Sequence, residues 1–335
     1  METSTNNGSI IPADVKGIIF DYGGTLDTRG DHWSHILEQG WRHAGIEVAL
    51  PTFRQCYVFA ERELARERHI LPGDDFAALL YKKALIELDE LGRINPEAAP
   101  ADAQKAAADI AAYCDAYARA CIEEARPVLE ALSERYPLML VSNFYGNVDS
   151  VLRAYDLRRY FRGVIESAVV GVRKPDPAIF MLGVVALGLE PRKVLVVGDS
   201  LRKDILPARS IGCHTAWIKG RGWDQAEDDA QDPAQIPSLA ALTATLRPPG
   251  TRWSGTEKRA KEKKFIKNEN FCLQPLHGPK KECTFASLNK ARHSPQLSIA
   301  TKNGVVVQLV RIPACHAGGR GFESRPYRQR REENE

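Results

Sequence analysis

Residues 17–27 read GIIFDYGGTLD, and this stretch gives the first indication of the fold. An apolar, β-rich run ends at Asp21, and a turn with two glycines follows at once. Such a run predicts a buried strand over 16–21. In a parallel sheet, ligands bind beyond the carboxyl ends of the strands, so Asp21 is placed where chemistry is expected.

The pattern after this strand becomes helical. Between 31 and 125, four segments rich in Ala, Leu, Glu and Lys space their apolar residues at three and four, and no strand pattern interrupts them. Breaks fall at 72–75 and 95–102, where Asp74 and Asp102 are expected to cap the next helices. We therefore predict an all-helical domain over 31–125.

Strand and helix patterns alternate from residue 127 onward. Helical patterns include 127–136 and a last helix at 238–246, and strand patterns cover 138–143, 163–167, 193–200 and 214–220. Repeated strand–helix units predict a parallel sheet with helices on both faces. The expected fold class is α/β: a Rossmann-like parallel sheet formed by 16–30 and 126–247, interrupted by the helical domain.

The whole chain has the composition of a globular protein. It has 335 residues, of which 44% are hydrophobic and 27% charged. It has no apolar run of transmembrane length, and residues 1–15 are polar, lack the features of a signal peptide and are expected to be disordered. The seven cysteines form no CxxC pair and are expected to be reduced thiols. The expected compartment is the cytoplasm.

Polar residues end three of the strand patterns, and a lysine precedes a helix between the second and the third. These residues are Asp21, the pair Ser142 and Asn143, Asp199, and Lys174 in GVRKPDPAIF. Alone, each is explained equally well as a turn residue, a helix entry or a solvated charge. In this order, the four segments resemble the motifs of the haloacid dehalogenase-like superfamily of hydrolases. The resemblance covers 16–247, and the helical insertion is similar to that family's first type of cap domain.

The chemistry of phosphate esters gives each motif residue a role. A carboxylate attacks a negatively charged phosphate only if Mg²⁺ and a lysine neutralise that charge, so Asp21 is the candidate nucleophile and Lys174 the candidate cation. Mg²⁺ prefers oxygen ligands, which Asp21, the Gly23 carbonyl and Asp199 would supply.

The remaining candidate residues surround these groups. Asp204 is the expected carboxylate beside Lys174, with a cap of its own helix as the alternative, and Ser200 is expected in the same second layer. The expected phosphate-binding residues are Ser142, Asn143, Lys174 and Thr25.

Gly23 departs from the resemblance. The family's phosphatases carry at this position an aspartate that protonates the leaving group, and general acid–base help is typically worth about 10² to 10⁴ in rate. A phosphatase with an easily released leaving group remains one interpretation, and Asp27, His32 or His35 is a possible substitute acid. Their alternatives are a turn-capping carboxylate for Asp27 and helix-surface residues for the histidines. A 2-haloacid dehalogenase and a non-catalytic phosphate- or partner-binding protein are the other interpretations.

Substrate choice is expected to lie with the helical domain. Its aromatic residues either line a substrate site or belong to its core: Trp33, Trp41, Phe53, Tyr57 and Phe59. The expected substrate is a small phosphorylated metabolite, and we expect neither a membrane nor a specific nucleic acid as partner.

The segment 248–335 differs in charge and pattern. From residue 251 it has 18 lysines and arginines against 8 glutamates and no aspartate, and it has no apolar periodicity. Its basic character alone suggests a nucleic-acid-binding arm. However, 306–326 resembles the conceptual translation of a bacterial aspartate transfer-RNA gene, because codons can be chosen for these residues that form an anticodon stem and a T-arm. We therefore expect a read-through tail with little structure.

Overall fold

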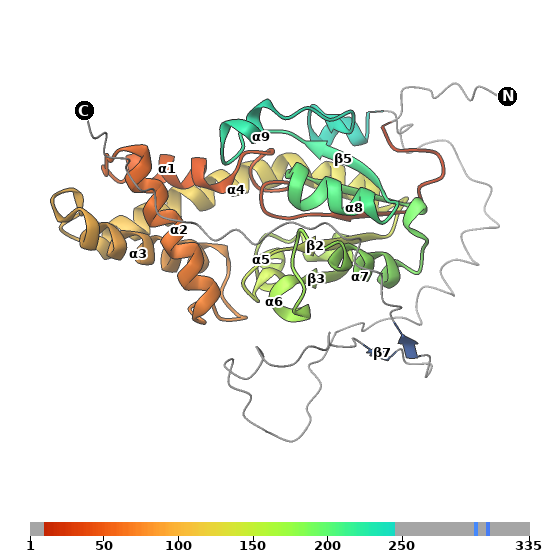
Figure 1. The fold of residues 1–335 in the computed structure, drawn as a ribbon, viewed down its shortest axis with the longest axis horizontal. Helices are drawn as coiled ribbons and strands as arrows, with labels where there is room; N and C mark the ends of the chain where they lie inside the picture. The colour runs from red at the N-terminus through yellow and green to blue at the C-terminus, as the bar shows by residue number, and fades with distance from the viewer. Residues whose placement is uncertain (1–9, 245–297, 301–305, 309–335) are drawn as a thin grey trace, which may run out of the picture. The chain divides into compact units, whose positions relative to one another are not determined.

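The computed structural model describes residues 10–244 and two short strands near the C-terminus (Figure 1). These strands, β7 (Ser298–Ala300) and β8 (Val306–Gln308), pair antiparallel and belong to a separate compact unit. The rest of the expected read-through tail, including most of 306–326, lies outside the described residues. Of the expected disordered N-terminus, residues 10–15 are described, and here the expectation is wrong, because Ile11 and Val15 are buried in the hydrophobic core.

Six parallel strands form one sheet within residues 10–244, in the order β3-β2-β1-β4-β5-β6. The central strand β1 pairs with both β2 and β4, and all three are fully buried, as expected for a parallel sheet covered on both faces. The strands are β1 (Gly17–Phe20), β2 (Leu138–Ser142), β3 (Phe161–Glu166), β4 (Val194–Gly198), β5 (His214–Ile218) and β6 (Gln235–Ile236). The α/β class expected from the sequence is confirmed.

Short helices connect these strands. They are α5 (Val148–Ala154), α6 (Ser167–Val170), α7 (Ala178–Leu187), α8 (Leu206–Ser210) and α9 (Gln225–Asp229). Helix α7 packs on β2 and β3, and α8 packs on β5. A π-helical turn, Leu201–Ile205, precedes α8. The last expected helix is reduced to a 3₁₀ turn at Leu239–Leu242, and 245–246 lie outside the described residues.

The chain between β1 and β2 is entirely helical. It forms α1 (Trp33–His43), α2 (Leu50–Arg66), α3 (Phe76–Ile94) and α4 (Ala103–Ser133), and the first three gather beyond one end of the sheet (Figure 1). Asp102 caps α4 as expected, accepting a hydrogen bond from the Lys105 amide. The cap expected at Asp74 is wrong: Asp75 caps α3, and Asp74 instead pairs with Lys82.

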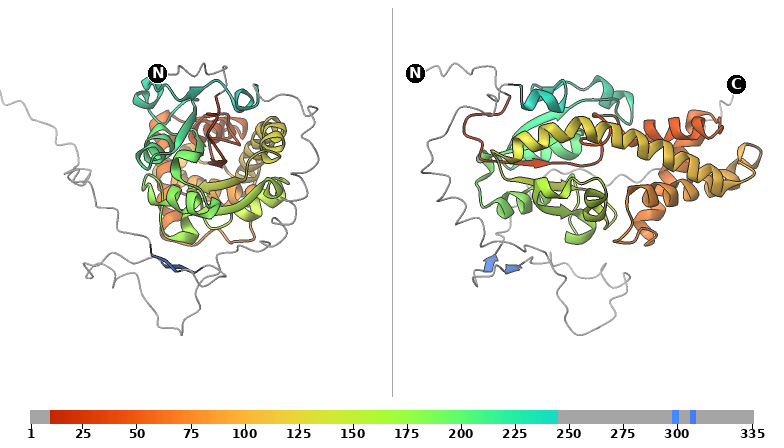
Figure 2. Two further views of the ribbon diagram at one scale, coloured as in Figure 1. Left: turned by 90° about the vertical axis from the view of Figure 1, so that its right-hand side faces the viewer. Right: turned by 180° about the vertical axis from the view of Figure 1, so that it is seen from behind.

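Helix α4 is continuous where the sequence predicts two helices. It runs through Pro127 and extends from the helical segment to the side of the sheet (Figure 2). Proline in a helix interior costs about 3 kcal/mol or more. Residues on both sides of it are buried, including Ala125 and Val128, so packing outweighs that local cost.

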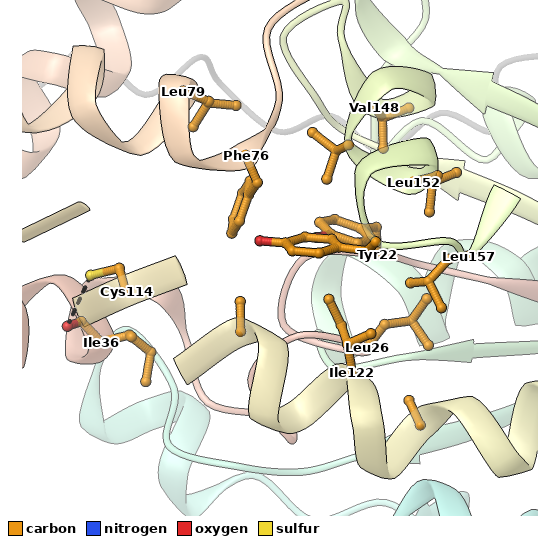
Figure 3. Packing of buried hydrophobic residues seen from close by; sticks show 14 of the residues in the cluster. Tyr22, Leu26, Ile36, Phe76, Leu79, Cys114, Ile122, Val148, Leu152 and Leu157 are labelled. Carbon is orange, nitrogen blue, oxygen red and sulfur yellow. Dashed lines mark hydrogen bonds between the residues drawn. The ribbon is translucent and has the colours of Figure 1, made fainter. Parts of the chain in front are cut away.

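The helical segment and the sheet share one hydrophobic core. Figure 3 shows Tyr22 and Leu26, from the loop after β1, among Phe76 of α3, Ile122 of α4 and apolar residues of α5. The rings of Tyr22 and Phe76 meet edge to face at 5.9 Å. This packing fixes the helical segment beside the loop that carries Asp21. Within the described residues, no helix combines the length and apolarity needed to cross a membrane.

Candidate active site

Three neighbouring strands bring the predicted polar residues to one edge of the sheet. Asp21 follows β1, Ser142 ends β2 with Asn143 after it, and Asp199 follows β4. Because β1 lies between β2 and β4 and all run parallel, their carboxyl ends lie side by side. Asp21 and Ser142 are buried, whereas Asn143 and Asp199 keep some accessible surface.

Lys174 lies between two carboxylates. Its Nζ is 2.7 Å from Asp21 Oδ1 and 2.6 Å from Asp204 Oδ1, and all three side chains are nearly inaccessible. Burial alone would lower the pKa of Lys174, but the Asp204 and Asp21 carboxylates raise it above its ordinary value. The ammonium group is therefore held in its charged form beside the candidate nucleophile.

Three carboxylates form a group around this lysine. Asp21, Asp199 and Asp204 each offer an oxygen, and these oxygens lie within 4.8 Å of one another. Burial, followed by repulsion from Asp204 and Asp21, raises the pKa of Asp199 well above its ordinary value. A set of hard oxygen donors with more negative than positive charge fits a divalent cation such as Mg²⁺.

Asp204 serves the first of its two expected roles. Its Oδ1 accepts a hydrogen bond from Lys174 and its Oδ2 accepts one, at 3.0 Å, from the Ser200 amide. The helical turn after β4 is capped by Ser200, whose hydroxyl accepts from the Lys203 amide. Gly198 allows this approach, since a Cβ there would lie 2.4 Å from the Asp204 Cβ. Ser200 therefore contributes its backbone amide to Asp204 and its side chain to the turn.

Besides Lys174, two of the residues predicted to bind phosphate, Thr25 and Asn143, have side chains that bond to the protein. The Thr25 hydroxyl is buried and donates to Asp199 Oδ1 at 3.0 Å. The Asn143 side chain holds the Lys174 backbone through two bonds: its Nδ2 donates to the Lys174 carbonyl, and its Oδ1 accepts from the Lys174 amide. These contacts orient Asp199 and the segment that carries Lys174.

Gly24 is a site residue that the sequence reasoning did not identify. Its backbone has a positive φ of 92°, and a Cβ there would lie 2.2 Å from Asp199 Oδ2. Only glycine therefore lets the loop after β1 approach the Asp199 carboxylate. The two consecutive glycines of the motif indicate a tight turn. The requirement for glycine at position 24 depends, however, on its contact with Asp199, which lies 175 positions further along the chain.

Gly23 lies beside an aromatic ring. A Cβ at this position would meet only the Trp33 indole, at 3.8 Å, which is an ordinary contact distance. The indole Nε1 of Trp33 donates to Asp27 Oδ2 at 3.0 Å, and the Gly24 amide donates to Asp27 Oδ1 at 2.7 Å. Burial raises the pKa of Asp27 to about 8, yet both of its oxygens accept hydrogen bonds within this turn. Asp27 thus closes the turn, as the structural alternative for this residue predicts.

The two candidate histidines also have structural partners. Burial, together with the nearby charges of Lys203 and Lys83, lowers the pKa of His32 to about 3, so its ring is neutral at physiological pH. Its Nδ1 accepts from the Ser34 amide at the start of α1. His35 Nε2 lies 2.8 Å from the Gly222 carbonyl, an acceptor that requires a proton on that nitrogen. The expected helix-surface role is wrong for His32, which is largely enclosed.

The aromatic residues of the helical segment divide between its core and its accessible surface. Trp41 and Phe53 are buried and meet edge to face, so they belong to the core. Trp33 and Phe59 keep some accessible surface, and Tyr57 is nearly buried against Trp223. Trp33 is the member of this group that lies beside the strand ends, next to Gly23.

The fold and these strand-end groups define an α/β protein of the hydrolase type, and comparison with known proteins identifies its family. The family model for haloacid dehalogenase-like hydrolases matches residues 15–212. The chain belongs to this family, and the resemblance seen in the sequence is confirmed.

Curated relatives match part of the chain. Haloacid dehalogenase-like hydrolase domain-containing protein 3 of Bos taurus is 32% identical over 128 residues, which are 37% of this chain and 51% of that protein. The glyceraldehyde 3-phosphate phosphatase of Pyrococcus abyssi is 35% identical over 98 residues, 28% of this chain and 41% of that protein. The matches thus span about half of these relatives or less.

Solved structures are similar over more of the chain but at lower identity. A 2-haloacid dehalogenase from Pseudomonas syringae is 22% identical, with a TM-score of 0.40, over 68% of this chain and 96% of that protein.

Proposed function

We propose that this protein is a Mg²⁺-dependent phosphatase that cleaves a small phosphorylated metabolite through an aspartyl-phosphate on Asp21. The observation that carries the proposal is the position of Lys174, held charged between Asp21 and Asp204 at the carboxyl ends of adjacent strands. The partial similarity to phosphatases, including the phosphoserine phosphatase of Thermus thermophilus, supports the same chemistry.

In this proposal Asp21 is the nucleophile, and other groups neutralise the charge of the phosphoryl oxygens. The Asp21 oxygen that does not contact Lys174 attacks phosphorus, the bond from phosphorus to the leaving group breaks, and water then releases phosphate from Asp21. Lys174 offsets the charge on the phosphoryl oxygens as it develops. Asp21, Asp199 and the Gly23 carbonyl would hold Mg²⁺, and Thr25 orients Asp199. When bound, Mg²⁺ supplies further neutralisation of the phosphoryl charge.

The residues around Gly23 indicate the kind of leaving group. Asp27 accepts two hydrogen bonds in its turn, His32 is neutral, and His35 is engaged by a carbonyl. Among the described residues, no hydrogen bond or ion pair joins any of these three side chains to Asp21. The pKa of about 8 leaves Asp27 protonated at neutral pH, but both of its oxygens are engaged by the Gly24 amide and the Trp33 indole. We therefore propose substrates whose leaving group departs without protonation, such as acyl, aryl or enol phosphates.

A phosphate-release assay with p-nitrophenyl phosphate tests the proposal. We expect turnover that requires Mg²⁺, and Asp21→Asn should lower it by at least about 10³-fold. Asp109→Asn, at an exposed residue of α4 that pairs with Lys105, is the matched control and should retain activity.

Two outcomes would overturn the proposal. Wild-type turnover of a 2-haloacid that persists in EDTA would identify a dehalogenase. Tight phosphate binding without turnover on any acyl, aryl or enol phosphate would identify a binding protein.

A further inference from the structure

Three polar side chains connect the helical segment to the loop that follows β2. Lys83 of α3 forms an ion pair with Glu61 of α2. The Tyr145 hydroxyl, from the core loop, lies 3.0 Å from Glu61 Oε1 and 3.2 Å from Glu61 Oε2. Lys83 also lies over the Tyr57 ring, with its Nζ 4.2 Å from the ring centroid. This group, Glu61, Lys83 and Tyr145, is called the bridge cluster below.

The bridge cluster lies close to the strand ends. Tyr145 comes three residues after Ser142, in the loop that leaves β2. The ring of His32, from the segment after the Asp21 loop, lies 5.9 Å from the ring of Tyr57, over which Lys83 is placed. The bridge cluster therefore faces the carboxyl ends of the same strands from the helical side.

The two charged members of the cluster differ in accessibility. Lys83 has only 5% of its side-chain surface accessible, whereas Glu61 keeps 36%. Glu61 is therefore the charged member of the cluster that a solute can reach. Burial alone would raise the pKa of Glu61, but the charge of Lys83 and the hydrogen bonds from Lys83 and Tyr145 lower it. The accessible group is thus a carboxylate held in its ionised form.

We infer that Glu61 contacts the leaving group of the substrate and selects one that carries an amine or another hydrogen-bond donor over one that carries a carboxylate. The inference rests on the proposed function, because it places the phosphoryl group at Asp21 and Lys174. Lys83 and Tyr145 are positioning residues: Lys83 keeps Glu61 charged, and Tyr145 ties it to the loop after β2. A donor gains a charge-assisted hydrogen bond to Glu61, and a carboxylate meets a like charge.

Binding of phosphonates, which cannot be hydrolysed, tests the inference separately from turnover. Benzylphosphonates with a para-aminomethyl or a para-carboxymethyl group are titrated into the full-length protein with Mg²⁺ by calorimetry. We expect the aminomethyl compound to bind about tenfold more tightly. Equal affinities, or a preference for the carboxymethyl compound, would overturn the inference even if p-nitrophenyl phosphate is hydrolysed. The predicted preference without any turnover would instead support the inference and contradict the phosphatase.

Variants then test whether Glu61 is the source of the preference for the aminomethyl compound. Glu61→Gln keeps the shape and the bond to Tyr145 but removes the charge, so the ratio of the two affinities should fall to about one. Tyr145→Phe should lower the ratio by a smaller factor. Glu63→Gln, on the same helix but paired with Arg66 and His69, is the matched control and should leave the ratio unchanged. The inference is wrong if Glu61→Gln keeps the wild-type ratio.

Discussion

At the edge of the sheet one buried lysine faces three carboxylates, whereas in the helical segment Lys83 pairs with a single carboxylate that remains accessible. Burying ions costs several kcal/mol for each ion unless partners compensate them. The helical pair is balanced within the protein, but the sheet-edge group has three carboxyl groups for one lysine. This difference is what the proposed function requires, because a sheet edge rich in carboxyl groups would receive a cation together with an anionic substrate, and the helical pair would leave Glu61 accessible to that substrate.

The largest expected effect concerns the general acid that Gly23 cannot supply. Gly23→Asp should raise kcat/KM for an alkyl phosphate by about 10²- to 10⁴-fold, because it adds a general acid where the added Cβ meets only the Trp33 ring at 3.8 Å. p-Nitrophenyl phosphate, whose leaving group needs no proton, should gain less. Gly23→Asn has the same shape without the acid, and an equal gain in that variant would contradict the explanation.

A second experiment tests the charge imbalance by removing each lysine. Lys174→Met leaves its carboxylates buried and unpaired, so the free energy of unfolding should fall by about 3–5 kcal/mol. Lys83→Met should cost less, about 1–3 kcal/mol, because water reaches Glu61. The measurement is denaturant unfolding, with Lys105→Met, at an exposed residue of α4, as the control.

The same variants separate the two clusters by their response to metal. At a Mg²⁺ concentration of about 100 times its dissociation constant, binding adds about 2.7 kcal/mol of stability. Mg²⁺ should therefore recover part of the loss in Lys174→Met and leave Lys83→Met no closer to the wild type. If Mg²⁺ restored the stability of both variants equally, the two clusters would not differ in metal binding as proposed.

The smallest expected effect concerns Glu87, a buried carboxyl group of the helical segment. Burial raises the pKa of Glu87 from its ordinary 4.5 to about 7, and its Oε2 accepts from the Trp41 indole at 3.0 Å. Between these two pH values the folded state holds a proton that the unfolded state has lost, so Glu87 lowers the stability of the protein as the pH rises.

Glu87→Gln should remove that dependence. The variant should gain about 1–3 kcal/mol over the wild type at pH 8 and little at pH 4.5, as measured by denaturant unfolding. The exposed Glu47→Gln is the control. A gain that is equal at both pH values would show that folding does not raise the pKa of Glu87.

Local patterns predicted most of the sheet and the residues at its edge. The strand ends at Asp21, Ser142 and Asp199 follow from apolar runs that stop at polar residues, and the parallel order follows from alternating elements. The two helices expected around Pro127 are one helix, because buried contacts along α4 outweigh a local rule. The cap at Asp75 rather than Asp74 is an error of one residue, within the usual uncertainty of helix ends.

Residue type and order along the chain are enough to assign the family, the candidate nucleophile and the lack of an aspartate at position 23. The contacts of each of these groups, in contrast, depend on how the chain packs. The bond from Thr25 to Asp199, the requirement for Gly24 and the pairing of Glu61 with Lys83 and Tyr145 join residues that are distant in sequence. Such contacts depend on how the helices and the sheet pack, and no local pattern encodes them.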